Sequence, residues 1–114
     1  MANTFKMATK SSLVTDAVSN STTNVLSIGS TATSIVLSVL ISNKVGSSAS
    51  ADVYLVTSTG DDVYLIRNAP IPGGSTLELI NGNKIILSSN DILRARADTS
   101  SALDISVSYL EQTP

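Results

Sequence analysis

Residues that could do acid–base or nucleophilic chemistry at neutral pH are scarce in this chain. His and Cys are both absent from its 114 residues, which removes the commonest general base, thiolate chemistry, disulfides and the usual zinc ligands. Serines are abundant, but none lies in a Gly-x-Ser-x-Gly elbow. Lys44 could activate a serine in principle, yet nothing in the sequence indicates that it is buried. We therefore expect a protein that is not an enzyme and that has no cofactor.

Two other kinds of site could be present, a calcium site and a sugar-binding platform. Asp61 and Asp62, beside Gly60, could contribute oxygen ligands to calcium, but such a site needs about six to eight ligands. Adjacent aspartates at a hairpin end are more often solvated turn residues, so we predict no metal site. Tyr54 and Tyr64 could form an aromatic platform for a sugar, or they could be a cross-strand packing pair.

A five-residue phrase that occurs twice predicts how these two tyrosines are placed. Residues 52–56, Asp-Val-Tyr-Leu-Val, are answered by residues 62–66, Asp-Val-Tyr-Leu-Ile. A hairpin with a three-residue loop, 58–60, puts Gly60 in the left-handed conformation that closes a bulge. This register places Tyr54 opposite Tyr64 and Val53 opposite Leu65.

The predicted register divides the hairpin into two faces. We expect the core face to hold Val53, Leu55, Val63 and Leu65. The opposite face is too apolar to meet only water, so either another part of the chain or another protein covers it. Its members, which we treat as candidate protein-interaction residues, are Tyr54, Val56, Tyr64 and Ile66.

Composition and periodicity predict an all-β fold. β-branched and aliphatic residues alternate with Ser and Thr, a mixture that suits pleated, half-buried strands. We expect a single antiparallel β-sandwich, immunoglobulin-like or jelly-roll in character, with about eight or nine strands. The expected strands are 4–10, 23–28, 34–42, 51–57, 62–67, 76–80, 84–87, 91–97 and 103–110.

Period-2 alternation predicts which side chains point inward. In the last strand Leu103, Ile105, Val107 and Tyr109 share the core face, and in the strand before it Leu93, Ala95 and Ala97 do so, with Arg94 and Arg96 outside. The run 35–41 is predicted to be a central strand, or one partly covered by a neighbour, with Ile35, Leu37, Val39 and Ile41 on one face.

The segments between strands contain turn residues. The sequence predicts a loop at 45–50, a crossover between sheets at 68–74, which contains Pro70 and Pro72, and a hairpin turn at Asn81-Gly82-Asn83.

The N-terminal stretch is a second candidate for protein contact. We divide the chain into an N-terminal strand or arm, 1–15, and a β-sandwich, 16–114, within one domain. Lys6 and Lys10 precede the first acidic residue, Asp16, on a chain of net charge −2, and Phe5 is the only Phe. Such an arm could dock on an acidic neighbouring subunit; an ordinary first strand is the alternative.

Charge and hydropathy exclude some partners and locations. An acidic chain without a basic face does not favour nucleic acid. The first residues lack the apolar region of a signal peptide, and the run 35–41 is too short to span a bilayer. We expect a soluble protein made in a cytoplasm, with no membrane partner.

Several phrases together resemble small virion structural proteins of tailed bacteriophages, especially marine phages of cyanobacteria. They are the opening 2–6, Ala-Asn-Thr-Phe-Lys, the segment 68–77, the strand 82–87 and the ending 107–111. The resemblance implies a location in the virion and a role as capsid decoration, cement or tail-associated subunit. It implies that the partners are major capsid or tail proteins and further copies of the chain. The alternative is a receptor- or carbohydrate-binding module on a fibre or capsid surface.

Overall fold

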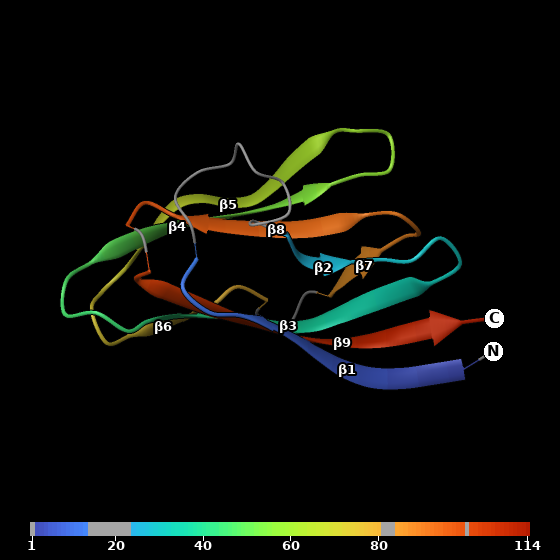
Figure 1. Ribbon diagram of the computed structural model, residues 1–114, viewed down its shortest axis with the longest axis horizontal. Helices are drawn as coiled ribbons and strands as arrows, with labels where there is room; N and C mark the ends of the chain where they lie inside the picture. Colours follow the sequence, from blue (N-terminus) through green and yellow to red (C-terminus); the bar gives the residue numbers. More distant parts are fainter. Residues whose placement is uncertain (1, 14–23, 81–83, 100) are drawn as a thin grey trace.

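The computed structural model describes residues 2–13, 24–80, 84–99 and 101–114. In these ranges there are nine strands and no helices, and the strands form two antiparallel sheets packed face to face (Figure 1). The prediction of an all-β sandwich is confirmed. Sheet A has the order β1-β9-β3-β6, with β7 also paired to β3, and sheet B has the order β2-β8-β4-β5. The strands are β1 (Ala2–Lys10), β2 (Asn24–Ser27), β3 (Thr33–Asn43), β4 (Ala49–Val56), β5 (Asp62–Ile71), β6 (Thr76–Glu78), β7 (Ile85–Leu87), β8 (Ile92–Ala97) and β9 (Leu103–Thr113).

Each strand overlaps one that the sequence predicts, because the apolar residues recur with the period of a pleated strand. The alternation in β8 and β9 is confirmed: Leu93, Ala95 and Ala97 are buried, and so are the four alternate residues of β9 that begin at Leu103. β3 is central, since it pairs with β9 on one side and with β6 and β7 on the other.

The predicted face of β3 is wrong in its first half. The pairing with β9 shifts between Val36 and Ser38, so that Leu37 is an extra, bulged residue. A one-residue bulge moves the residues before it to the opposite face. Val36 is therefore buried with Val39 and Ile41, whereas Ile35 lies on the outer face.

The β4–β5 hairpin confirms the turn and part of the register. The Thr57 N–H donates to the Asp61 carbonyl at 2.9 Å, and Gly60 has a φ of +94°. Tyr54 pairs with Tyr64, as predicted, but Val53 pairs with Ile66 and not with Leu65. This shift turns Ile66 toward the core, against which it packs with Leu65.

Val63 also departs from the prediction, since its side chain is 46% exposed and does not belong to the core. It lies on the edge strand close to the tip of the hairpin, where the hairpin extends away from sheet A (Figure 1). Without a facing sheet, an inward-pointing residue remains in contact with solvent.

Two loops are shorter in the structure than the sequence predicts. Residues 68–71 belong to β5, where Pro70 is tolerated because β5 is the edge of sheet B. Only the residues after Ile71 cross to β6 in sheet A. Likewise, β4 begins at Ala49, so the predicted loop 45–50 ends two residues earlier, at Ser48.

The hairpin predicted around Asn81-Gly82-Asn83 is wrong in its pairing. Those three residues lie outside the described ranges, but the flanking strands β6 and β7 do not pair with each other. Both pair antiparallel with β3, at 40–42 and at 34–36 respectively. They lie one after the other along the same edge of β3.

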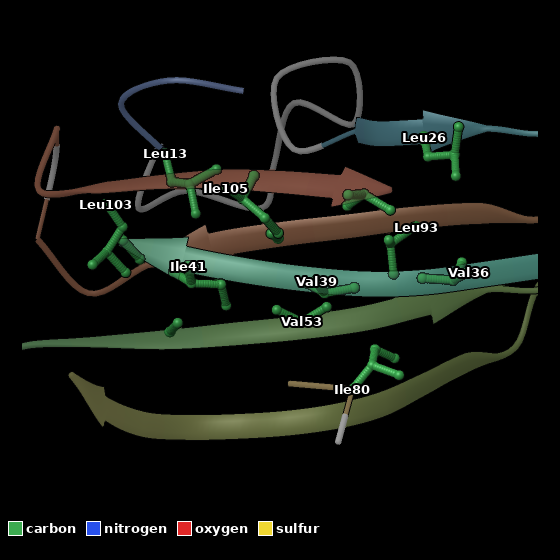
Figure 2. Packing of buried hydrophobic residues seen from close by; sticks show 14 of the residues in the cluster. Leu13, Leu26, Val36, Val39, Ile41, Val53, Ile80, Leu93, Leu103 and Ile105 are labelled. Carbon is green, nitrogen blue, oxygen red and sulfur yellow. The ribbon is translucent and has the colours of Figure 1, made fainter. Parts of the chain in front are cut away.

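The core lies between the two sheets and consists of aliphatic side chains from both. Figure 2 shows Val39, Ile41 and Ile105 of sheet A near Val53 and Leu93 of sheet B. Among the described residues, only Ser34 and Asn43 are buried polar residues. Asn43 is satisfied, since its Nδ2 donates to the carbonyls of Ser47 and Ile71, both at 2.9 Å, and its Oδ1 accepts from the Val45 N–H at 3.0 Å.

Candidate interaction surfaces

The outer face of sheet B carries a stacked tyrosine pair. The rings of Tyr54 and Tyr64 lie 5.0 Å apart between centroids, with 28° between their planes. Tyr54 is only 4% exposed, although it does not belong to the core between the sheets, and Tyr64 is 37% exposed. The stack itself therefore covers part of the apolar face that the sequence predicts for this hairpin.

All three arginines of the chain lie around this pair. The Arg96 guanidinium carbon is 5.6 Å from the Tyr54 ring centroid, and that of Arg67 is 5.2 Å from the Tyr64 centroid. Arg96 also donates from Nη2 to the Tyr64 hydroxyl at 3.0 Å. Arg94 pairs with Tyr54 across β8 and β4. We call these five residues the Tyr–Arg cluster.

Asp52 connects Arg96 of the cluster to the backbone of β5. Its Oδ2 accepts from Arg96 Nε at 2.8 Å, and its Oδ1 accepts from the N–H of Asn68 at 2.7 Å. The hydrogen bond with Asp52 raises the pKa of Arg96, so the guanidinium stays charged. Arg94 Nε donates instead to the neutral Oδ1 of Asn24 at 2.7 Å. Hydrogen bonds and ring contacts thus hold Arg94, Arg96 and the two tyrosines to neighbouring strands.

A sugar platform does not fit this arrangement. A platform needs an open aromatic face, but Tyr54 is buried and a guanidinium lies over Tyr64. Of the other two residues predicted for this face, Val56 pairs with Asp62 near the turn and is half-buried, whereas Ile66 turns to the core.

The N-terminal candidates lie on β1, which pairs with β9 from Ala2 to Lys10 and forms the edge of sheet A. Lys6 makes an ion pair with Glu111 at 2.9 Å, and this hydrogen bond raises the pKa of Lys6. Phe5 and Met7 point to the opposite face and are 77% and 65% exposed. In β1 the side chains most exposed for contact with another protein are therefore the apolar ones, Phe5 and Met7, and not the lysines.

Phe5 is the first member of an apolar row across the outer face of sheet A. Phe5 pairs with Leu110, Leu110 with Ile35, and Ile35 with Ile86. Directly opposed residues point to the same face, so the four side chains form one line across β1, β9, β3 and β7. We call Phe5, Leu110, Ile35 and Ile86 the apolar row.

Sequence reasoning missed this row, because its members are distant in sequence and the bulge at Leu37 puts Ile35 on the outer face. Its ends are open: Phe5 is 77% exposed and Ile86 is 64% exposed. The only signal available in the sequence was the apolar pair at 5 and 7, which alternates with polar residues.

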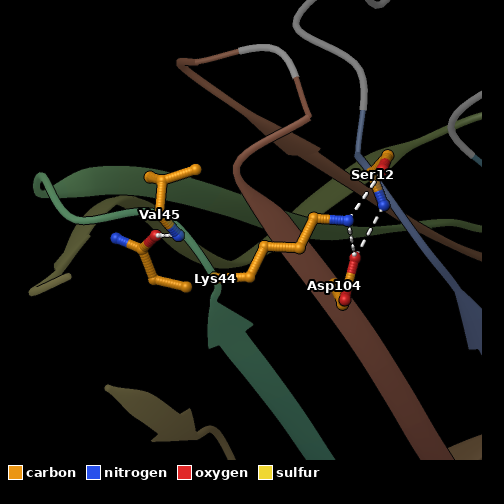
Figure 3. Close-up of polar contacts among 5 residues, drawn as sticks. Ser12, Lys44, Val45 and Asp104 are labelled. Atoms are coloured by element: carbon orange, nitrogen blue, oxygen red, sulfur yellow. Dashed lines mark hydrogen bonds and ion pairs between the residues drawn. The ribbon is translucent and has the colours of Figure 1, made fainter. Parts of the chain in front are cut away.

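The far end of the same face is polar. Asp104 accepts from the Ser12 N–H at 2.8 Å and from Lys44 Nζ at 2.9 Å, and Lys44 also donates to Ser12 Oγ at 2.8 Å (Figure 3). The hydrogen bond from the Ser12 N–H lowers the pKa of Asp104 most, and the hydrogen bond from Lys44 lowers it further. Lys44 thus touches a serine, and its ammonium is paired with the Asp104 carboxylate. The three residues join the end of β1, β3 and β9.

An open groove of about 420 Å³ lies next to this triad and is lined by Thr9, Lys10, Ser11, Leu40, Ser42, Asp104, Ile105 and Ser106. The part of the chain that the structure describes contains no group of three acidic residues placed to hold a metal ion. Asp61 Oδ2 instead accepts from Thr59 Oγ1 at 3.4 Å within the turn. In the same ranges, no helix is long and apolar enough to cross a membrane.

Comparisons with known proteins identify no family. Neither a protein-family model nor a curated protein matches the chain. Among solved structures, the chain is similar to one from the infectious bursal disease virus Gx strain, with a TM-score of 0.40 and 12% sequence identity. The match covers 96% of this chain and 35% of the other, so the chain spans about a third of that protein's length.

Proposed function

We propose that this chain is a non-enzymatic structural subunit of a tailed-phage virion, which docks on neighbouring protein subunits as a capsid decoration, cement or tail-associated component. The location in a phage particle is based on the sequence resemblance described above. The docking role is based on one structural observation, the apolar row on the outer face of sheet A.

The row supports docking because of where the exposed apolar side chains gather. Among the described residues six large apolar side chains are exposed, and four of them lie on this face: Phe5, Met7, Leu40 and Ile86. Contiguous exposed apolar surface on a soluble domain marks a contact site. A large aromatic and a branched aliphatic residue at the ends of the row would supply the anchors that dominate interface energies.

The alternative of a receptor- or carbohydrate-binding module has less support. The tyrosines that would form its platform are occupied by their own stack and by arginines. The groove beside Asp104 is lined by hydroxyl groups, but no aromatic residue lines it.

Incorporation into particles tests the proposal. Particles assembled with Phe5→Ser or Ile86→Ser protein are expected to contain about tenfold fewer copies than wild type, measured by quantitative mass spectrometry. Val63→Ser is the matched control, since it also replaces an exposed apolar residue but lies on sheet B. Full incorporation of both row variants, or absence of the wild-type chain from purified particles, would contradict the proposal.

A further inference from the structure

We infer that the outer face of sheet A packs on the same face of a second copy of this chain, in a two-fold arrangement whose axis runs along the strands. The inference rests on the proposed function, because it names the partner of the same surface. Three observations carry it: the nearly uncharged character of the face, its size, and the way its rows match when they are reversed.

The face contains almost no charge. Of the outward positions on its strands, only Glu78 and Asp104 are charged, and Asp104 is paired with Lys44 at 2.9 Å. A copy of this face would therefore meet little like-charge repulsion. Away from the apolar row, many of the remaining outward residues are small and hydroxylated, which allows two sheets to approach to the usual packing distance of about 10 Å. These small residues include Thr9, Ser38, Ser42, Ser106 and Ser108.

The size of the face suits a stable dimer. Three strands of nine to eleven residues, with the short β6 and β7 one after the other in a fourth position, give an area of roughly 600 Å² at a spacing of about 4.8 Å. Each partner in an interface of standard size contributes about 800 Å². The whole face, with its rim, is therefore close to what such an interface requires.

A two-fold axis along the strands reverses the strand order in the second copy. The apolar row then lies on the reversed row, so that Phe5 of one copy faces Ile86 of the other. Phe5 and Ile86 are the two most exposed residues of the row, and in the dimer each would cover the other.

The same reversal keeps the one unpaired carboxylate of the face away from its own copy. A second row of the face reads Thr9, Ser106, Leu40 and Glu78 across β1, β9, β3 and β6. In the copy, Glu78 would lie over Thr9. Glu78 makes no ion pair with any residue that the structure describes, and the Thr9 hydroxyl would give its carboxylate a hydrogen-bond donor in each half of the dimer. An axis across the strands that ran along this row would instead place Glu78 over Glu78.

Sedimentation equilibrium over a dilution series gives the first test. Wild-type protein is expected to dimerise, and Phe5→Ser or Ile86→Ser should raise the dissociation constant by at least about tenfold. Val63→Ser is expected to leave it unchanged. The contact of Glu78 is tested by Thr9→Glu, which should weaken the dimer, whereas the variant that combines Thr9→Glu with Glu78→Lys should recover it.

Cross-linking tests the arrangement itself, and the absence of Cys gives a clean background. A bis-maleimide of about 10 Å span, matching the distance between packed sheets, should link Phe5→Cys protein to Ile86→Cys protein in a mixture. Phe5→Cys protein alone should give little product. Strong cross-linking of Phe5→Cys with itself would indicate pairing through the β1 edge and would overturn the inference.

The two proposals fail in different ways. A chain that is monomeric in solution at all concentrations, but whose row variants are lost from particles, overturns the second-copy inference and leaves the docking role standing. A chain that dimerises as described but is absent from particles contradicts the proposed function alone. Circular dichroism and urea denaturation confirm in each case that the variants are folded.

Discussion

The rings of Tyr54 and Tyr64 stack 5.0 Å apart on adjacent strands of one hairpin, outside the core between the sheets. The two residues occupy equivalent positions in the repeated phrase. The stack buries Tyr54 almost completely while Tyr64 remains partly open.

A double-mutant cycle should measure this stack. Tyr54→Ala is expected to lower the free energy of unfolding by about 3 kcal/mol, because a large buried side chain is lost. Tyr64→Ala should cost about 1 kcal/mol. The coupling between them, from urea denaturation of both single variants and the double variant, is expected to be about 0.5–1.5 kcal/mol. Strictly additive effects would show that the rings do not stabilise each other.

Gly73 should not tolerate even a methyl group. A Cβ on Gly73 would come within 2.6 Å of the backbone C and O atoms of Gly46, in the loop before β4. Since backbone atoms cannot move aside as a side chain can, Gly73→Ala is expected to destabilise by about 1–3 kcal/mol. Gly29→Ala is the control, because a Cβ there meets nothing within 4 Å. Equal thermal midpoints for the two variants would contradict the close approach.

The two buried polar residues should respond in opposite ways. Asn43 makes three hydrogen bonds that tie the loop after β3 to Ile71, so Asn43→Ala is expected to cost about 2–4 kcal/mol. Ser34 Oγ has no hydrogen-bond partner among the described residues, so Ser34→Ala should be neutral or stabilise by up to about 1 kcal/mol. Chemical denaturation of both variants checks the contrast, and a large loss for Ser34→Ala would reveal a bond that this structure lacks.

Asp104 should make stability depend on acid pH. Its pKa in the folded protein lies below the ordinary value of 3.8 because of hydrogen bonds from Ser12 and Lys44. The resulting stabilisation is fully present above that ordinary value and is lost as the pH falls through the folded pKa.

The carboxylate is partly exposed, so the effect is small, about 0.5–1 kcal/mol. Asp104→Asn should remove it and flatten the fall in urea midpoint between about pH 6 and about pH 2. Lys44→Gln should remove only part of it. Curves of the same shape for wild type and Asp104→Asn would contradict this assignment.

The sequence by itself determined the strands, because apolar residues recur with the period of two that a half-buried strand needs. It also determined the hairpin turn and the pairing nearest to it, since Gly60 and the three-residue loop set the local geometry. The burial of Leu93, Ala95 and Ala97 followed from the same alternation.

Only the tertiary structure decided where that alternation breaks. The bulge at Leu37 and the register shift beside Val53 depend on the strands alongside, which local spacing does not reveal. They turned Ile35 outward and Ile66 inward. The apolar row arose in the same way: residues 5, 110, 35 and 86 become neighbours only when four strands pair in register. A surface made of cross-strand neighbours is a property of the sheet, and its members leave no common pattern along the chain.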